Sequence, residues 1–98
     1  MLIRIVKLSF HEKNIPVFLE HFNVMKEKIR SVEGNLFLEL YQDQNDPCLF
    51  FTYSFWKTEQ DLENYRRSEL FYDVWTFTKN LFNKKPEAWS VNKIVSLP

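Results

Sequence analysis

A strand followed by two helix-start signals is the feature that most constrains the fold of this chain. Residues 49–56, Leu-Phe-Phe-Thr-Tyr-Ser-Phe-Trp, are largely apolar or aromatic on both faces, which is typical of a central strand covered on both sides. Thr58 precedes Asp61 by three residues, a pattern that resembles a capping box and predicts the start of a helix. Ser68 followed by Glu69 predicts a second start, so we expect a bent helical hairpin rather than one continuous helix.

The N-terminal part of the chain predicts a strand, a helix and a second strand. Residues 2–10 are β-rich, and apolar residues then recur at helical spacing over residues 15–30, with Asn14 as the expected N-cap. Gly34, the only glycine, is expected to take a positive φ before residues 36–42, which alternate as a strand.

The whole order is therefore β-α-β-β-α-β. Residues 43–47 have the composition of a turn, so the second and third strands should pair antiparallel, and residues 88–95 alternate as a last strand. This order predicts an α+β, ferredoxin-like fold with a four-stranded antiparallel sheet that carries its helices on one face. Because the strands carry large apolar groups on both sides, we expect the open face to pair with a second copy as a homodimer.

Length and charge exclude several classes of function. The 98 residues fit a single domain, 1–98. Thirteen basic and thirteen acidic side chains cancel, so neither a nucleic acid nor an anionic membrane surface is an expected partner. No apolar run approaches the roughly 20 residues that cross a bilayer. The single Cys48 makes no internal disulfide and the first residues lack the pattern of a signal peptide, so a cytoplasmic location is expected.

Metal and nucleotide sites are not expected either. His11 and His21 are the only histidines, and neither has further ligands at metal-binding spacing. One glycine is too few for a dinucleotide or phosphate-binding loop, so we expect no cofactor. His21 lies at the margin of an apolar helix stripe, where it is either a surface histidine or a proton carrier at the edge of a pocket.

The aromatic content of 17% exceeds what a small core needs, so a ligand cavity or a subunit interface should use the excess. Five residues combine a flat apolar ring with a polar atom. Core packing explains part of this set, and the alternative is a cavity between sheet and helices that holds a small aromatic ligand by stacking. The five residues are Tyr53, Trp56, Tyr65, Tyr72 and Trp75.

The strand that ends at Trp56, the Lys-Thr-Glu-Gln-Asp-Leu of residues 57–62 and the Arg-Ser-Glu-Leu-Phe of residues 67–71 resemble the antibiotic biosynthesis monooxygenase family. The resemblance spans nearly the whole chain and implies a dimeric α+β barrel. Many members oxidise quinols or polyketide aromatics with O₂ and without metal or flavin, while relatives degrade haem or isomerise small signalling molecules. A cofactor-independent monooxygenase is therefore the leading expectation, although the shared motif shapes a scaffold common to all these activities.

Departures from the family pattern bear on the reaction. Many members carry histidines at two helix positions that here hold Tyr65 and Leu70. The haem-degrading branch has Asn, Trp and His at three positions that here hold Val6, Tyr65 and Trp75, so haem degradation ranks below quinol-type oxidation. The missing histidines favour a second hypothesis, a small-molecule-binding module without catalysis, and an isomerase is a further alternative.

A cofactor-independent oxygenase must bind an electron-rich phenol or enol, favour its deprotonation and keep the anion dry beside O₂. By resemblance, Tyr65 and Tyr72 are the expected catalytic residues, which would hydrogen-bond the oxyanion. Trp75 would stack on the ring and Arg66 would be a charge partner. The other expected substrate-binding residues are His21, Tyr53, Trp56 and Phe71.

Overall fold

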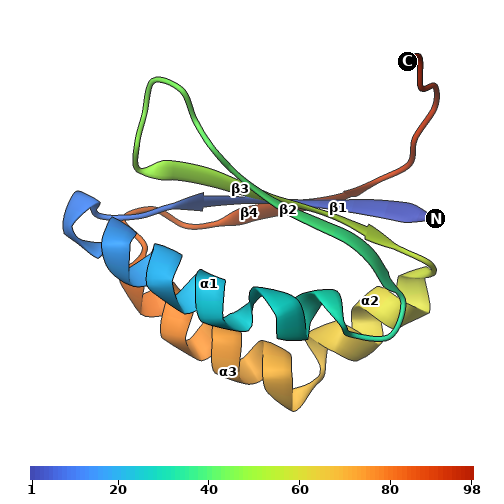
Figure 1. The fold of residues 1–98 in the computed structure, drawn as a ribbon, viewed down its shortest axis with the longest axis horizontal. Helices are drawn as coiled ribbons and strands as arrows, with labels where there is room; N and C mark the ends of the chain where they lie inside the picture. The colour runs from blue at the N-terminus through green and yellow to red at the C-terminus, as the bar shows by residue number, and fades with distance from the viewer.

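The computed structural model describes residues 1–98 as one sheet with helices on a single face (Figure 1). The helices and strands follow the predicted β-α-β-β-α-β order, with the second helical region broken in two. In chain order they are β1 (Leu2–Ser9), the 3₁₀ helix η1 (Glu12–Asn14), α1 (Ile15–Arg30), β2 (Asn35–Gln42), β3 (Leu49–Trp56), α2 (Glu59–Arg66), α3 (Glu69–Thr78), the 3₁₀ helix η2 (Lys79–Leu81) and β4 (Glu87–Val91). The predicted α+β, ferredoxin-like fold is confirmed.

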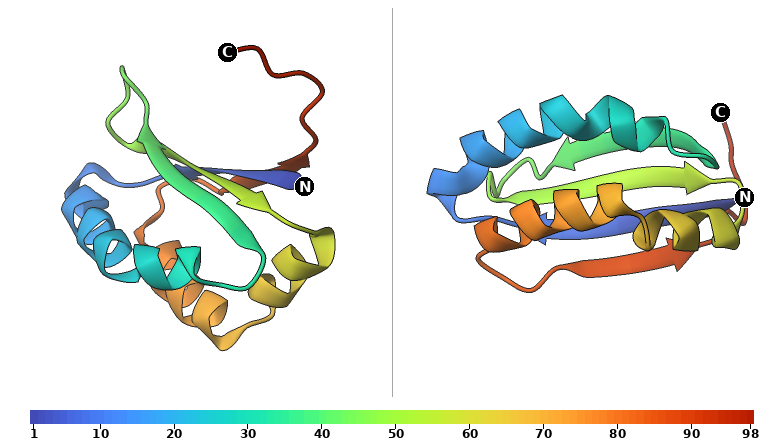
Figure 2. Two further views of the ribbon diagram at one scale, coloured as in Figure 1. Left: turned by 45° about the vertical axis from the view of Figure 1, so that its right-hand side comes forward. Right: turned by 90° about the horizontal axis from the view of Figure 1, so that it is seen from below.

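All strand pairs are antiparallel, and the order across the sheet is β2-β3-β1-β4. The apolar strand β3 is central, as the apolar residues on both of its faces predicted, although helices cover only one of these faces. The view from below shows α1 and the α2–α3 pair side by side across the sheet, with β4 at an edge (Figure 2). The other face of the sheet carries no helix, and the chain leaves β4 on that side (Figure 1).

Both predicted caps of the bent hairpin are confirmed. The Thr58 hydroxyl accepts a hydrogen bond from the backbone N–H of Asp61 at 3.0 Å, and the Ser68 hydroxyl accepts one from Phe71 N–H at 3.1 Å. Each cap satisfies a backbone donor that the first helical turn leaves free. The break between α2 and α3 is therefore encoded in the local sequence.

Asn14 stands at the N-cap position of α1 as predicted, but its side chain does not cap the helix. An N-cap needs an extended backbone to turn its side chain back onto the helix, but Asn14 has a helical conformation, with φ −93° and ψ −6°, at the end of η1. Its side-chain amide instead donates to the Leu81 carbonyl at 3.2 Å, which ties the start of α1 to the end of the α3 region.

Gly34 takes the predicted positive φ, at +86°. A side chain at this position would also clash with Asp61 at the start of α2. The Gly34 carbonyl accepts a hydrogen bond from Lys57 N–H at 2.8 Å, so the turn after α1 lies directly against the end of β3.

The last strand is shorter than predicted. It runs from Glu87 to Val91 instead of reaching residue 95, and its pairing with β1 ends at Ile3 opposite Val91. The α3 helix ends at Thr78, and η2 continues it to Leu81. None of the helices combines the length and the apolar character that crossing a membrane requires.

An aromatic cluster fills one end of the space between sheet and helices. Phe10 and Phe18 stack with their ring centroids 4.2 Å apart, and Phe50 packs edge-on against both rings. Leu8 completes this buried cluster. The core therefore lies where β1 ends and α1 begins, and the rest of the layer is packed differently.

Candidate functional site

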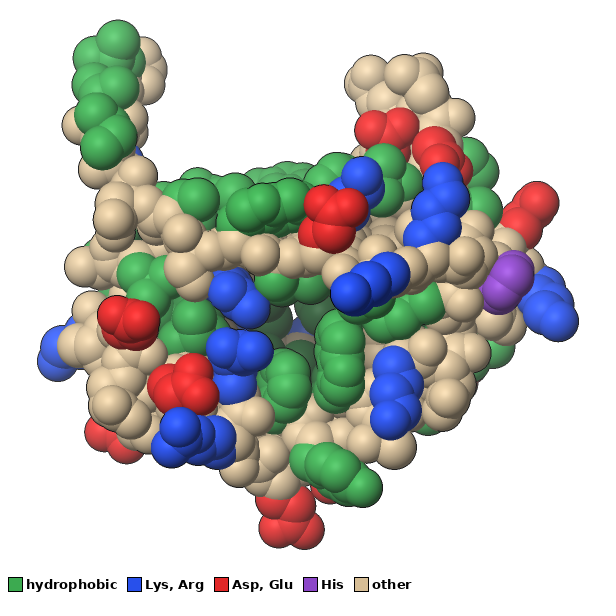
Figure 3. All heavy atoms as spheres, turned by 180° about the vertical axis from the view of Figure 1, so that it is seen from behind, with side chains coloured by type: hydrophobic (Ala, Val, Ile, Leu, Met, Phe, Trp, Pro, Cys, Tyr) green, Lys and Arg blue, Asp and Glu red, His purple; other side chains and the backbone are tan.

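A cavity of about 370 Å³ lies between the helix-bearing face of the sheet and the helices. Along β3 the side chains on this face are Phe50, Thr52, Ser54 and Trp56, so two small residues separate two large ones. Seen from behind, the molecule is hollowed between the sheet and the helices, with Lys and Arg side chains gathered beside the opening (Figure 3). The space is thus enclosed by large rings at its ends and left free over small side chains.

The walls of the cavity are mostly apolar. The sheet also contributes Val6, Leu38 and Ala88, and α1 contributes Phe18, His21, Phe22, Met25 and Ile29. The bent hairpin contributes Leu62, Tyr65, Arg66, Phe71, Val74, Trp75 and Thr78. This composition suits a flat, largely apolar ligand that is oriented by a few polar groups. Several polar groups at the cavity are already used within the protein, since the Ser54 hydroxyl accepts from the Trp56 indole N–H at 3.0 Å and the Thr78 hydroxyl donates to Val74 O.

Tyr65 is the best-placed polar group of the bent hairpin. Its ring stacks on Trp56 at 5.2 Å between centroids, and Phe71 packs edge-on against it. The Tyr65 hydroxyl makes no hydrogen bond within the protein, and no fully buried side-chain oxygen or nitrogen lacks a partner, so this hydroxyl is accessible, on a residue that lines the cavity. Burial raises the pKa of Tyr65 to about 12, so the phenol stays protonated near neutral pH and is a hydrogen-bond donor.

His21 lies at the cavity, which favours its interpretation as a pocket-edge residue over that of an ordinary surface histidine. Its ring stacks on Phe77 with centroids 4.0 Å apart. Burial lowers the pKa of His21 from its usual value, so the imidazole is neutral near pH 7 and has a nitrogen that accepts a proton.

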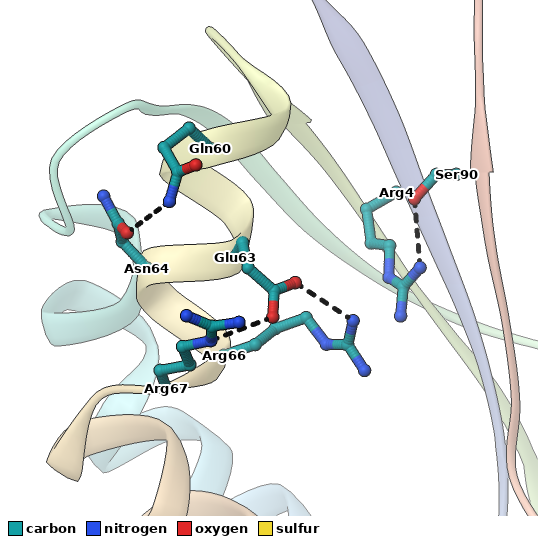
Figure 4. A network of polar contacts seen from close by, with 7 residues as sticks. All are labelled: Arg4, Gln60, Glu63, Asn64, Arg66, Arg67 and Ser90. Atoms are coloured by element: carbon teal, nitrogen blue, oxygen red, sulfur yellow. Dashed lines mark hydrogen bonds and ion pairs between the residues drawn. The ribbon is translucent and has the colours of Figure 1, made fainter.

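Arg4 is a cavity residue that the sequence analysis missed. It projects from β1 on the helix side with Val6, and its guanidinium donates to the Ser90 hydroxyl at 3.0 Å. Arg66 extends from α2 toward it (Figure 4). Burial and, secondly, the positive charge of Arg66 lower the pKa of Arg4, while Glu63 opposes them. The signal was a charged residue on the inward face of β1, which otherwise carries the apolar Val6 and Leu8.

Two expected site residues lie outside the cavity, so the predicted convergence is wrong for Tyr53 and Tyr72. Tyr53 alternates with Ser54 along β3 and packs against Phe37 and Phe55, which puts it on the opposite face of the sheet. Tyr72 follows Phe71 by one residue, about 100° around α3, and is 69% exposed. The other expected residues, Trp56, Tyr65, Arg66, Phe71, Trp75 and His21, all line the cavity.

No three or more His, Cys, Asp or Glu side chains are grouped closely enough to hold a metal ion. The polar groups that line the cavity include a neutral phenol, an imidazole and two guanidinium groups. Together they offer hydrogen-bond donors, one proton acceptor and positive charge around an apolar space.

The sequence model of the antibiotic biosynthesis monooxygenase family matches residues 1–74. The chain belongs to this family. No curated protein matches it significantly in sequence.

Solved structures share the fold at low sequence identity. A crystal structure of an antibiotic biosynthesis monooxygenase superposes with a TM-score of 0.90 at 20% identity, over 97% of this chain and 100% of the other. A conserved protein from Methanosarcina mazei Go1 gives 0.87 at 22% identity, over 95% and 93%. A candidate antibiotic biosynthesis monooxygenase from Nitrosomonas europaea gives 0.88 at 18% identity, over 97% and 100%. At these identities the structures establish the fold that this family member shares with them, and no more.

Proposed function

We propose that this family member is a cofactor-independent monooxygenase that oxidises a quinol or a polyketide-like aromatic with O₂. The observation that carries the proposal is the apolar cavity of about 370 Å³ with a free, neutral Tyr65 phenol and a neutral His21 imidazole in its lining. Membership in the family supports a monooxygenase, and the cavity supports a flat aromatic substrate.

The substrate itself supplies the electrons. Loss of a proton from a phenol or enol yields an electron-rich anion, which transfers one electron to O₂. The radical pair then combines into a C–O bond, and a proton completes a hydroperoxide. Loss of water breaks the O–O bond and leaves a carbonyl at the ring carbon that carried a C–H bond in the phenol or enol. One oxygen atom enters the product and the other leaves as water, so no external reductant is needed.

The cavity residues divide this work between them. His21 is the proposed acceptor of the substrate proton, because its neutral imidazole is the only neutral side-chain base in the lining. Tyr65 donates a hydrogen bond to the oxyanion, and the Trp75 ring stacks on the substrate. The apolar walls exclude water that would otherwise protonate the anion. Tyr72 is left out of the mechanism because its side chain is exposed.

Haem degradation stays the less favoured prediction. Val6, Tyr65 and Trp75, which stand where the haem-degrading branch carries Asn, Trp and His, all line the cavity. None of the three offers a haem ligand of the family's type, and Trp and Tyr rings instead suit stacking on a smaller aromatic.

The open face of the sheet supports a two-fold homodimer. Phe37, Tyr41, Tyr53 and Phe55 form a contiguous aromatic cluster there, and Trp89 lies on the same face beside Ile5. An uncovered aromatic surface of this kind is typical of subunit contacts. Sedimentation equilibrium tests the dimer, and a monomer at all concentrations would contradict it.

The cytoplasmic location also remains a prediction, which cell fractionation tests.

The test of function is oxygen uptake by chelator-treated protein with a panel of quinols and hydroxylated polyaromatics, with heat-killed protein as the autoxidation control. We expect uptake above the control, and about a hundredfold lower kcat in Tyr65→Phe and in His21→Gln. His11→Gln is the matched control, because His11 is exposed and lies outside the cavity lining. Uptake equal to that of heat-killed protein across the panel would contradict the proposal and favour a non-catalytic binding module or an isomerase.

A further inference from the structure

Two arginines from different elements meet at one side of the cavity. Arg4 projects from β1 and Arg66 from α2, and Figure 4 shows the Arg66 side chain reaching toward the guanidinium of Arg4. The only side-chain partner of Arg4 is the neutral Ser90 hydroxyl, at 3.0 Å. Like charges on separate elements approach in this way only at a cost, so the arrangement needs a reason.

The acidic side chains nearby do not balance this charge. Glu63 lies 3.5 Å from Arg66 and 3.2 Å from Arg67, so one carboxylate serves two guanidinium groups and none pairs with Arg4. A net positive charge therefore lies at the cavity. Its consequence is visible in the lowered pKa of Arg4, to which burial and then the charge of Arg66 contribute.

Glu87 is the only acidic residue among those that line the cavity. It stands opposite Lys7 in the sheet, whereas Arg4 stands opposite Ser90, three residues further along β4 and about 10 Å away. Side chains alternate along a strand, so Glu87 and Arg4 project on opposite faces. Glu87 is therefore not a partner for the two arginines.

We propose that Arg4 and Arg66 form an anion subsite that binds a carboxylate carried by the aromatic ligand. This inference rests on the proposed function and narrows its substrate class to hydroxylated aromatic carboxylic acids. The planar guanidinium groups match a carboxylate, and the half-exposed Arg66, at 46%, leaves room for one. Tyr65 precedes Arg66 in α2 and lines the same cavity, so a ring beside Tyr65 directs its carboxylate to the arginines.

A binding measurement tests this subsite independently of catalysis. Quenching of tryptophan fluorescence reports binding, since Trp56 and Trp75 line the cavity. The probes are a dihydroxynaphthoic acid and its methyl ester, which differ in charge but share the ring. We expect the acid to bind about tenfold more tightly than the ester, with a preference that shrinks as salt concentration rises.

Variants assign the preference to the two arginines. Arg66→Gln and Arg4→Gln should each reduce the tenfold preference to about onefold and leave ester binding unchanged, and unchanged ester binding also shows that the variant is folded. Arg67→Gln is the matched control, because Arg67 shares Glu63 but is 76% exposed and outside the cavity lining; it should keep the preference.

Equal affinity of wild type for acid and ester, absence of saturable acid binding, or equal weakening of both probes in Arg66→Gln would overturn the subsite. Oxygen uptake tests the proposed function in a separate experiment. Arginine-dependent binding of the acid without uptake supports the subsite and contradicts the oxygenase. Uptake with no preference between acid and ester supports the oxygenase and overturns the subsite.

Discussion

The two ends of the layer between sheet and helices are built on the same strands yet packed in opposite ways. At one end Phe50 is 1% exposed and packs against Phe10 and Phe18. Toward the other end Thr52 and Ser54 occupy the next two positions on the same face of β3, and a cavity opens above them before the buried Trp56 closes the layer. The pairing of β1 with β3 keeps one register along this whole stretch, so the difference follows from side-chain size.

This difference separates the part of the layer that stabilises the fold from the part that can bind a ligand. Interiors are normally close-packed, and unfilled space forfeits contacts on one side. The aromatic end follows that rule. The hollow end departs from it, and it is also where Tyr65, His21 and Arg4 lie. Polar groups without a full set of partners are gathered where a ligand can supply them.

The largest expected effect is a loss of stability when the packed end is disrupted. Phe50→Ala should lower the free energy of unfolding by about 3–5 kcal/mol, because a fully buried ring leaves a void among neighbours that relax little. Urea unfolding measures it. The matched variant is Tyr72→Ala on the 69% exposed position of α3, which should change stability by no more than about 0.5 kcal/mol. Equal losses in the two variants would show that the aromatic cluster does not hold the fold.

A smaller effect tests the hollow end through Tyr65. Its pKa of about 12 in the folded protein lies above the unfolded value of about 10, so the folded state holds this proton more tightly. The resulting stability is fully present below about pH 10 and is lost as the pH rises toward 12. Over that range wild type should lose about 2–3 kcal/mol more than Tyr65→Phe. Urea unfolding at a series of pH values checks this, and parallel declines of the two proteins would show that the phenol is not desolvated.

The smallest expected effect on stability comes from a substitution that adds a ring at the hollow end, next to the packed one. Thr52→Phe places a second ring on β3 next to Phe50, and the existing space should accept it with a stability change within about 1 kcal/mol. Ligand affinity should fall at least about tenfold, measured by tryptophan fluorescence with the dihydroxynaphthoic acid.

Thr76→Phe on α3 is the matched variant, because it adds the same ring at a position outside the cavity lining. Its ligand affinity should stay at the wild-type value. Equal affinities of Thr52→Phe and wild type would mean that the ligand binds elsewhere.

Residue patterns predicted much of the site, and the predictions that failed did so for physical reasons. Trp56, Tyr65 and Trp75 were expected at a cavity and line it. The prediction for Tyr53 was wrong because side chains alternate along β3, which puts Tyr53 on the face opposite Trp56. Tyr72 was misplaced because one residue along a helix turns a side chain by about 100°.

Local signals in the chain were sufficient for the order of elements, the caps at Thr58 and Ser68 and the positive φ of Gly34, because each depends on atoms a few residues apart. Tertiary structure alone decided that Asn14 bonds to Leu81 rather than capping α1, and that the Arg66 side chain extends toward Arg4 beside a cavity. These outcomes depend on how α2 and α3 pack over the sheet, and the size of the space between layers is set by side chains from distant segments together.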